Sequence, residues 1–163
     1  MSFPRGEVAA TVERYHALRR RIDAGEEEGF GVLADFYTED AVYIDAAWGR
    51  IEGRAAIKSW LSDSMVGLGD WQFPIEFTAI EGNNVVVKWT QILPGKRPDG
   101  SSYSQSGYSR LIYAGDGRFS YEEDVYNMAH VLEDLAASGW QPTEPMNIPP
   151  ATPDRNWTVP ADH

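Results

Sequence analysis

Apolar residues recur at every third or fourth position near the start of the chain, and this spacing predicts an amphipathic helix. The helix is expected over residues 7–23, where the apolar stripe consists of Val8, Val12, Tyr15, Leu18 and Ile22. A second, shorter helix is expected from Phe30 to about Tyr37, after Gly25 has ended the first. A third helix follows Gly53 and carries Ile57, Trp60 and Leu61 on one side.

The pattern changes to alternating apolar and polar residues from Trp71 onward, which predicts β-strands. Strands are expected at 71–80, 85–93, 103–113 and 119–126, and a short one already at 41–45. Residues 82–84 and 114–117 have the composition of tight turns between antiparallel neighbours, and residues 94–100 are expected to form a loop. A last helix starts after Asn127 as its N-cap and ends at Gly139.

Three helices, a series of strands and one closing helix indicate an α+β fold. The expected geometry is a strongly curved, mostly antiparallel sheet wrapped around the N-terminal helices. Residues 1–139 are expected to form one domain. Residues 140–163 form a tail that contains six of the ten prolines and almost no periodicity. We expect this tail to be extended or disordered, and to lie over the domain or over a neighbouring subunit.

The charge balance argues against a nucleic-acid partner. The chain of 163 residues carries 25 acidic and 14 basic residues, for a net charge of -11, whereas phosphate binding needs clustered lysine and arginine. The basic cluster at residues 19–21 is followed by three glutamates at 26–28, and both are interpreted as solvated charges at helix ends.

Several classes of site are not expected from the composition. The chain has no cysteine, which excludes disulfides and thiolate chemistry. His16, His130 and His163 are dispersed without metal-ligand spacing, so neither a metal nor another cofactor is expected. No apolar run approaches the length of a membrane span, and the N-terminus lacks the apolar core of a signal peptide. A cytoplasmic protein without a membrane partner is expected.

A carboxylate lies among apolar residues in the strand at 41–45. Tyr43 and Asp45 are two positions apart, so their side chains point to one face of the strand. A carboxylate in apolar surroundings needs a polar partner or has a raised pKa. Two interpretations follow. Asp45 pairs with Arg50, with Arg54 or with the amides of the next turn, or it faces a pocket and transfers protons.

Two motifs near this strand carry a family resemblance. The layout, with Tyr-Thr-Glu-Asp-Ala-Val-Tyr-Ile-Asp at 37–45 and Glu-Gly-Arg-Ala-Ala-Ile at 52–57, resembles the SnoaL-like superfamily over about residues 8–138. That superfamily also contains ketosteroid isomerase, limonene epoxide hydrolase and nuclear transport factor two. The resemblance implies a cone that encloses a deep, mostly apolar pocket, and a homodimer formed through the outer face of the sheet. It does not define the reaction, because the fold hosts many chemistries.

The comparison with ketosteroid isomerase implies roles for two residues. Tyr15 corresponds to the tyrosine that holds the enolate oxygen, and Asp45 to the general base. The second, protonated aspartate of that enzyme corresponds to about Ser109, which is a departure from the isomerase pattern. The alternative for Tyr15 is ordinary core packing.

The comparison with limonene epoxide hydrolase implies a different set. Its strand tyrosine corresponds to Tyr43 and its last-strand aspartate to Asp124, while its arginine and a further aspartate correspond to Trp89 and Gln91. SnoaL-type cyclases also use an acid/base aspartate on the closing strand, which again indicates Asp124. The alternatives are surface charge for Asp124 and plain core for the residues at 89 and 91.

The remaining candidates would shape the pocket. The family alignment points Glu122, Asp124 and Tyr126 inward, and Trp48 and Trp60 are expected in the wall or the lid. If Asp45 and Asp124 share one apolar pocket, their repulsion raises the pKa of one of them.

Three functions are compatible with the sequence. The first is a cofactor-independent enzyme that uses a pocket aspartate for proton transfer on an apolar, oxygenated small molecule, of the isomerase or cyclase type. The second is a ligand-binding or dimeric interaction module without catalysis. The third is epoxide hydrolysis.

Overall fold

A computed structural model describes residues 1–161, so His163 lies outside the described part of the chain. Its helical elements are α1 (Arg5–Asp23), the 3₁₀-helix η1 (Phe30–Phe36), α2 (Arg54–Ser64) and α3 (Met128–Ser138). Its strands are β1 (Tyr37–Asp45), β2 (Gly49–Glu52), β3 (Ile75–Glu81), β4 (Asn84–Lys96), β5 (Ser102–Gly115) and β6 (Arg118–Tyr126). The order of elements is that of an α+β fold.

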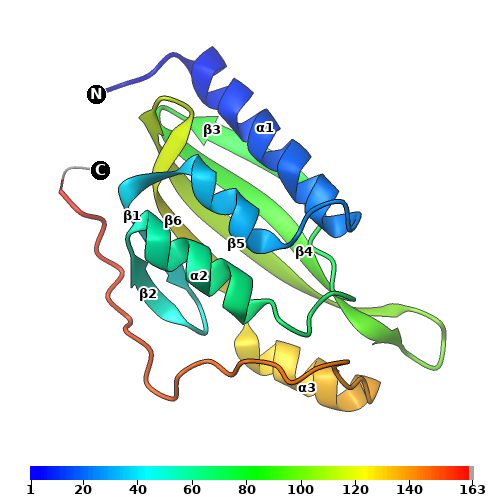
Figure 1. Cartoon of the computed structure of the whole chain (residues 1–163). Helices are drawn as coiled ribbons and strands as arrows, with labels where there is room; N and C mark the ends of the chain where they lie inside the picture. Colours follow the sequence, from blue (N-terminus) through cyan, green and yellow to red (C-terminus); the bar gives the residue numbers. More distant parts are fainter. Residues whose placement is uncertain (162–163) are drawn as a thin grey trace.

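The six strands form one curved, open sheet in the order β2-β1-β6-β5-β4-β3. Strands β1 and β6 run parallel, and the other neighbouring pairs are antiparallel. The helices α1, η1 and α2 lie on one side of the sheet, and α3 lies across its end (Figure 1). The predicted cone of helices inside a mostly antiparallel sheet is confirmed, and it places β1 and β6 side by side under η1 and α2.

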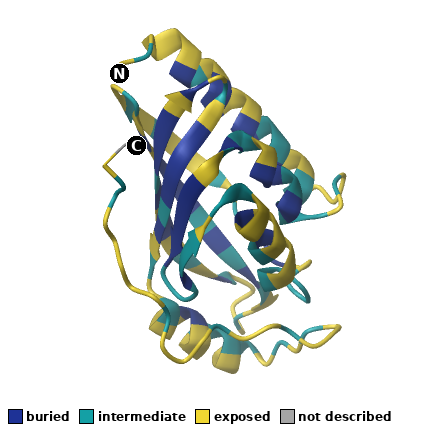
Figure 2. Cartoon of the chain, turned by 60° about the vertical axis from the view of Figure 1, so that its left-hand side comes forward, coloured by how far each residue is buried: buried dark blue, intermediate teal, exposed yellow. Residues whose placement is uncertain are grey.

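The core lies between the helices and the sheet, where Figure 2 shows the buried residues. The apolar stripe of α1 supplies Val8, Val12 and Tyr15, and β4 faces it with Val85 and Val87. Each apolar side chain buried in this way contributes about 1.5 to 3 kcal/mol to folding. The predicted ends of α3 are also present. The Asn127 side chain accepts hydrogen bonds from two backbone N–H groups, and Gly139 ends the helix with a φ of 65°.

Several elements differ from the sequence prediction. Strand β1 begins at Tyr37 and not at residue 41, and β4 continues to Lys96, into the expected loop at 94–100. The second helix is a 3₁₀-helix of seven residues, a length at which apolar spacing cannot separate the two helix types. Residues 49–52, where no strand is expected from the sequence, form β2, because the φ of 81° at Gly49 reverses the chain and returns it against β1. The strand expected from Trp71 starts at Ile75, since Pro74 has no N–H to donate and the preceding residues make only the bridge from Gln72 to Ile92.

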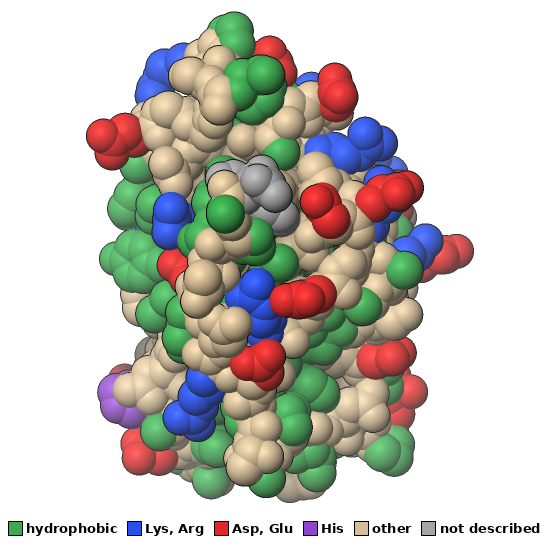
Figure 3. All heavy atoms as spheres, turned by 90° about the vertical axis from the view of Figure 1, so that its left-hand side faces the viewer, with side chains coloured by type: hydrophobic (Ala, Val, Ile, Leu, Met, Phe, Trp, Pro, Cys, Tyr) green, Lys and Arg blue, Asp and Glu red, His purple; other side chains and the backbone are tan. Residues whose placement is uncertain are grey.

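Residues 140–161 contain no helix or strand and lie against the body (Figure 1). The guanidinium of Arg50 donates to the carbonyl of Asn156 over 3.1 Å and to that of Thr158 over 2.8 Å. Nearer the start of the tail, the Asn147 side chain donates to the carbonyl of Asp63 over 2.6 Å. Figure 3 shows acidic and basic side chains interspersed over the face along which the tail runs.

Candidate functional site

A cavity of about 240 Å³ opens between the sheet, the three N-terminal helices, α3 and the tail. Its walls are largely apolar and aromatic, and include Phe30, Leu33, Trp60, Trp71, Phe73, Trp89 and Val131. Residues 146–149 of the tail also line it, at the edge near α3. The eleven residues proposed from the sequence as catalytic or ligand-binding all line this one cavity: Tyr15, Tyr43, Asp45, Trp48, Trp60, Trp89, Gln91, Ser109, Glu122, Asp124 and Tyr126.

Asp45 is held by three hydrogen-bond donors at the end of β1. Its Oδ1 accepts from the backbone N–H groups of Ala47 (2.8 Å) and Trp48 (2.9 Å) and from the hydroxyl of Tyr126 (3.0 Å). The residue is only 6% exposed, and this burial raises the pKa of the Asp45 carboxyl, while the three donors oppose the rise. Asp45 therefore combines the two interpretations left open by the sequence, because it bonds turn amides and also lines the cavity.

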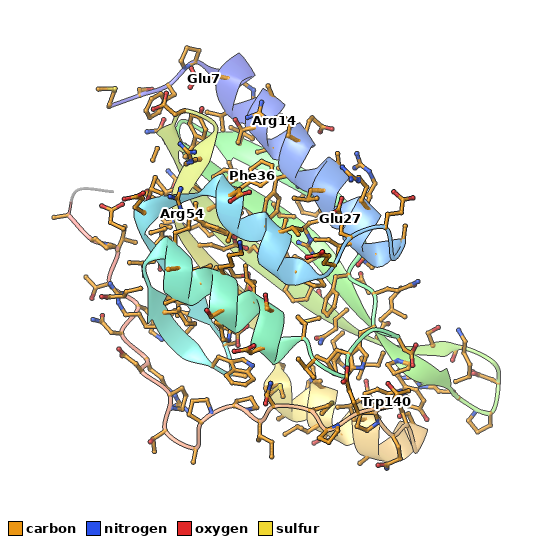
Figure 4. The ribbon with its side chains drawn as sticks, in the orientation of Figure 1. Glu7, Arg14, Glu27, Phe36, Arg54 and Trp140 are labelled. Carbon is orange, nitrogen blue, oxygen red and sulfur yellow. The ribbon has the colours of Figure 1, made fainter. Side chains whose placement is uncertain are left out.

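The expected arginine partners of Asp45 point elsewhere. Arg50 pairs with Glu52 over 2.6 Å besides holding the tail. Arg54, at the start of α2 (Figure 4), pairs with Glu39 over 2.9 Å. Neither arginine neutralises the Asp45 carboxylate by direct contact.

The carboxyl group of Asp124 accepts hydrogen bonds from two hydroxyl groups. Ser109 donates to Oδ1 over 2.5 Å, and Tyr43 donates to Oδ2 over 2.6 Å. The indole N–H of Trp89 donates to the Ser109 hydroxyl over 2.9 Å, which directs the hydroxyl proton of Ser109 toward Asp124. Ser109, where the isomerase comparison places a second acid, is thus a donor to the acid on β6.

Asp124 and Glu122 form a buried acid pair. The Tyr43 hydroxyl contacts both carboxyl groups, at 2.6 Å from Oδ2 of Asp124 and 3.3 Å from Oε1 of Glu122. Burial, followed by the charges of Glu122 and Asp45, raises the pKa of Asp124 well above its ordinary value. Burial also raises the pKa of Glu122, and the hydroxyls donated to each acid oppose the rise, that of Tyr37 at Glu122 and those of Ser109 and Tyr43 at Asp124. Burial of the pair therefore favours a proton on one of the two carboxyl groups.

Tyr15 packs edge-on against Phe36 and Phe119, with ring centroids 5.4 and 5.8 Å away. It also lines the cavity, and burial, followed by the charge of Glu122, raises the pKa of its hydroxyl. Tyr15 is therefore both a core residue and part of the cavity wall.

Arg19 corrects one interpretation of the sequence. The sequence predicts that Arg19, like Arg20 and Arg21, is exposed to solvent. In the structure Arg19 is only 8% exposed and lines the cavity, whereas Arg20 and Arg21 are exposed. The reason is helical spacing. Arg19 follows Tyr15 by four residues and so lies on the same face of α1. This spacing could have identified Arg19 as a cavity residue, but the run of three arginines suggested a solvated charge cluster.

Buried polar atoms without a protein partner also lie among the cavity residues. Within the described chain these atoms are Nε1 of Trp60, Nε1 of Trp71 and Oε1 of Gln91. Trp60 stacks against Tyr43 with ring centroids 4.7 Å apart. Trp71 packs against Trp140, which lies beyond the end of α3 (Figure 4). Sequence reasoning missed Trp71, and the unpaired atoms are available to a bound molecule.

Among residues 1–161, no three histidine or acidic side chains come together in a way that would hold a metal ion. Over the same residues, no helix has the length and apolar character needed to cross a bilayer. His16 lies outside the cavity lining, and burial lowers the pKa of its imidazole to about 4.

Comparison with known proteins agrees with this architecture. The sequence profile of the SnoaL-like domain matches residues 12–122. The chain belongs to the SnoaL-like family. No curated protein matches it in sequence.

Solved structures of this family share its fold. One is a protein from Jannaschia sp. whose assignment as a SnoaL-like polyketide cyclase is itself provisional. It is 18% identical, with a TM-score of 0.60, and the match covers 81% of this chain and 93% of that one. A ketosteroid isomerase-like protein from Catenulispora acidiphila has 19% identity, a TM-score of 0.55, and coverage of 75% and 94%. An epoxide hydrolase of the limonene type from M. tuberculosis has 18% identity, a TM-score of 0.57, and coverage of 82% and 92%. At these identities the likeness establishes the fold and leaves the reaction open.

Proposed function

We propose that this SnoaL-like protein is a cofactor-independent enzyme that moves a proton next to a carbonyl group of an apolar, oxygenated small molecule. The reaction would be an isomerisation or an aldol-type cyclisation. The observation that carries the proposal is the contrast between two carboxyl groups at one apolar cavity. Asp45 accepts from two backbone N–H groups and one hydroxyl, whereas Asp124 accepts from two hydroxyls and has its pKa raised by burial and by the charge of Glu122.

The contrast assigns a role to each acid. Donors directed at a carboxylate favour its charged form, so Asp45 is the general base. The acid pair keeps its proton on Asp124, which donates it to the oxygen that becomes negative when the base removes a proton from the neighbouring carbon. Environments that push two pKa values apart are the usual basis of such a division of labour. Tyr15, which also lines the cavity, would be a further donor to that oxygen.

The state of the cavity supports an enzyme over a module that only binds partners. A pocket filled by bulky side chains, with Asp45 bridged to an arginine, would favour a non-catalytic role. Instead the cavity is open, and Asp45 is bonded to amides and a tyrosine. Solved relatives named as cyclase and hydrolase use the same fold for small-molecule chemistry.

Epoxide hydrolysis is the second candidate, and it depends on Gln91. Its buried Oε1 has no partner among the described residues and is an acceptor for an attacking water. Against this role, both Asp124 oxygens already accept hydroxyl protons, so Asp124 is poorly placed to deprotonate that water. Hydration of styrene oxide by the purified protein would favour this candidate.

The test is proton exchange on a probe ketone. The purified protein is incubated with 2-tetralone in D₂O, and loss of the α-proton signals is followed by NMR. We expect exchange above the buffer rate, and a fall of about 10²- to 10⁴-fold in Asp45→Asn. Asp35→Asn, which changes an exposed carboxylate on η1, is the matched control and should exchange like the wild type. Equal rates for Asp45→Asn and the wild type would show that Asp45 is not the base.

A further inference from the structure

Arg19 is a buried cation that has almost no protein partner. Its guanidinium offers five N–H donors, and the hydrogen bond that the described residues give it runs from Nη2 to the carbonyl of Phe73, over 3.2 Å. None of the ion pairs within residues 1–161 includes Arg19. A buried guanidinium is retained at high desolvation cost, so its remaining donors call for an acceptor.

The carboxyl groups whose charges act on Arg19 do not provide that acceptor. They are Glu122, Asp124 and Asp23. Glu122 accepts from Tyr37, Asp124 from Ser109 and Tyr43, and Asp23 from the backbone N–H of Phe73. Each of these acids has a donor elsewhere, and none is paired with the guanidinium in an ion pair. The free donors of Arg19 therefore belong to the cavity that this residue lines.

The surroundings of Arg19 suit a flat apolar molecule. The rings of Phe30, Phe73, Trp89 and Tyr126 follow one another along the wall with successive centroids 5.7, 6.1 and 6.0 Å apart, the first two contacts edge to face and the third tilted. Trp60 and Trp71 add buried indole N–H groups without protein acceptors. The cavity groups that lack a protein partner are thus mostly hydrogen-bond donors, which match a ligand rich in oxygen acceptors.

We propose that Arg19 binds an anionic oxygen of the substrate, so that the cavity accepts a planar, aromatic or conjugated molecule bearing a carboxylate or an acidic enol. This assignment rests on the proposed function only in taking the cavity as the substrate site. Arg19 lies on α1, and the proposed base lies at the far end of β1. The anion would thus be held from the helix side of the cavity while the sheet provides the carboxyl groups that exchange protons.

The test compares two probes of one shape. 2-Naphthoate and 2-naphthamide have the same ring and nearly the same size, and near pH 7 only the carboxylate is charged. Binding is measured by titration calorimetry, with quenching of tryptophan fluorescence as a second readout. The wild type should bind the naphthoate about 10- to 100-fold more tightly than the naphthamide, the range expected for a charge-assisted hydrogen bond. Arg19→Met should remove this preference and leave naphthamide affinity unchanged.

The matched control is Arg20→Met, which makes the same change of charge and shape at the exposed neighbour on α1. It should keep the wild-type preference. The proposal is overturned if the wild type binds both probes equally or does not bind the naphthoate, or if Arg20→Met loses the preference as Arg19→Met does. It is also overturned if Arg19→Met loses both probes, because Arg19 would then support the shape of the pocket. All of these results are binding measurements and do not depend on turnover. A negative result for Arg19 can therefore be distinguished from a negative result for Asp45 as the base.

Discussion

The hydroxyl of Tyr126 lies 3.0 Å from Oδ1 of Asp45 and donates to it. This bond joins the end of β6 to the end of β1, where the two strands run parallel. It gives the proposed base a donor from the same strand that carries the acid pair. The protonation of Asp45 therefore depends on a residue outside its own strand and turn.

Replacement of Tyr126 by phenylalanine should change the pH profile of the reaction. Burial is the main cause of the raised pKa of Asp45, and the Tyr126 hydroxyl is one of the groups that hold the value down. Without that donor the pKa of Asp45 rises further, so the acid limb of kcat/KM should move to higher pH. The profile is measured with 2-tetralone in the exchange assay. The control Tyr108→Phe, on the exposed outer face, should leave the acid limb of the pH profile unchanged. An acid limb that does not move in Tyr126→Phe would contradict this account.

Neutralising Asp124 should stabilise the folded protein at neutral pH. The pKa of Asp124 is raised in the folded state by burial and by nearby acids. A raised folded-state pKa stabilises the fold below the ordinary value of 3.8, and this stability is lost as pH rises through the folded value. Urea unfolding of Asp124→Asn should therefore show a gain on the order of 1 kcal/mol at neutral pH and a weaker dependence on pH. The exposed control Asp35→Asn should follow the wild type, and a destabilised Asp124→Asn would argue against a protonated Asp124.

Removal of the Ser109 hydroxyl should destabilise the fold. Ser109→Ala leaves Nε1 of Trp89 without an acceptor and Oδ1 of Asp124 without a donor. Buried polar groups left unpaired cost about 1 to 3 kcal/mol each. Chemical unfolding should show a loss in that range, whereas Ser104→Ala, at an exposed position of the same strand, should show little change. A neutral Ser109→Ala would mean that water replaces the hydroxyl.

Gly107 sets the position of the Trp89 ring. A Cβ atom at residue 107 would lie 2.2 Å from Cη2 of Trp89, so Gly107→Ala has to displace the indole from the cavity wall. Overpacking of this kind typically costs about 1 to 3 kcal/mol of stability. Naphthamide affinity should fall as well, while Gly6→Ala, where no atom lies within 4 Å of the added Cβ, should bind normally. Unchanged binding by Gly107→Ala would place the ligand away from Trp89.

The outer face of the sheet carries the surface through which we propose that the protein dimerises. Strand register places Phe77, Lys88, Tyr108 and Val125 in one row across four strands. Three of these are exposed apolar side chains, with Phe77 53%, Tyr108 44% and Val125 56% exposed. Light scattering should give a dimer mass for the wild type and a monomer mass for Val125→Asp. A monomeric wild type would exclude this interface.

The sequence was sufficient for most of the cavity, because the period of two on β1 and β6 determines which side chains share a face. Tyr43 and Asp45 on one strand, with Glu122, Asp124 and Tyr126 on the other, follow from that alternation and from the family resemblance. The hydrogen bonds did not follow, since they depend on how β1 lies beside β6, a long-range pairing. Arg19 was missed because a run of like charges suggests solvent, whereas one position of that run belongs to the buried face of α1.

The central claim is that Asp45 is ionised and Asp124 protonated in the same cavity at neutral pH. Carboxyl-labelled ¹³C-aspartate observed by NMR tests it most directly, with Asp45→Asn and Asp124→Asn used to identify the two signals. The account predicts that the signal lost in Asp124→Asn has the chemical shift of a protonated carboxyl near pH 7, and that the signal lost in Asp45→Asn has that of a carboxylate. Two ionised signals, or the reverse assignment, would contradict the division into base and acid.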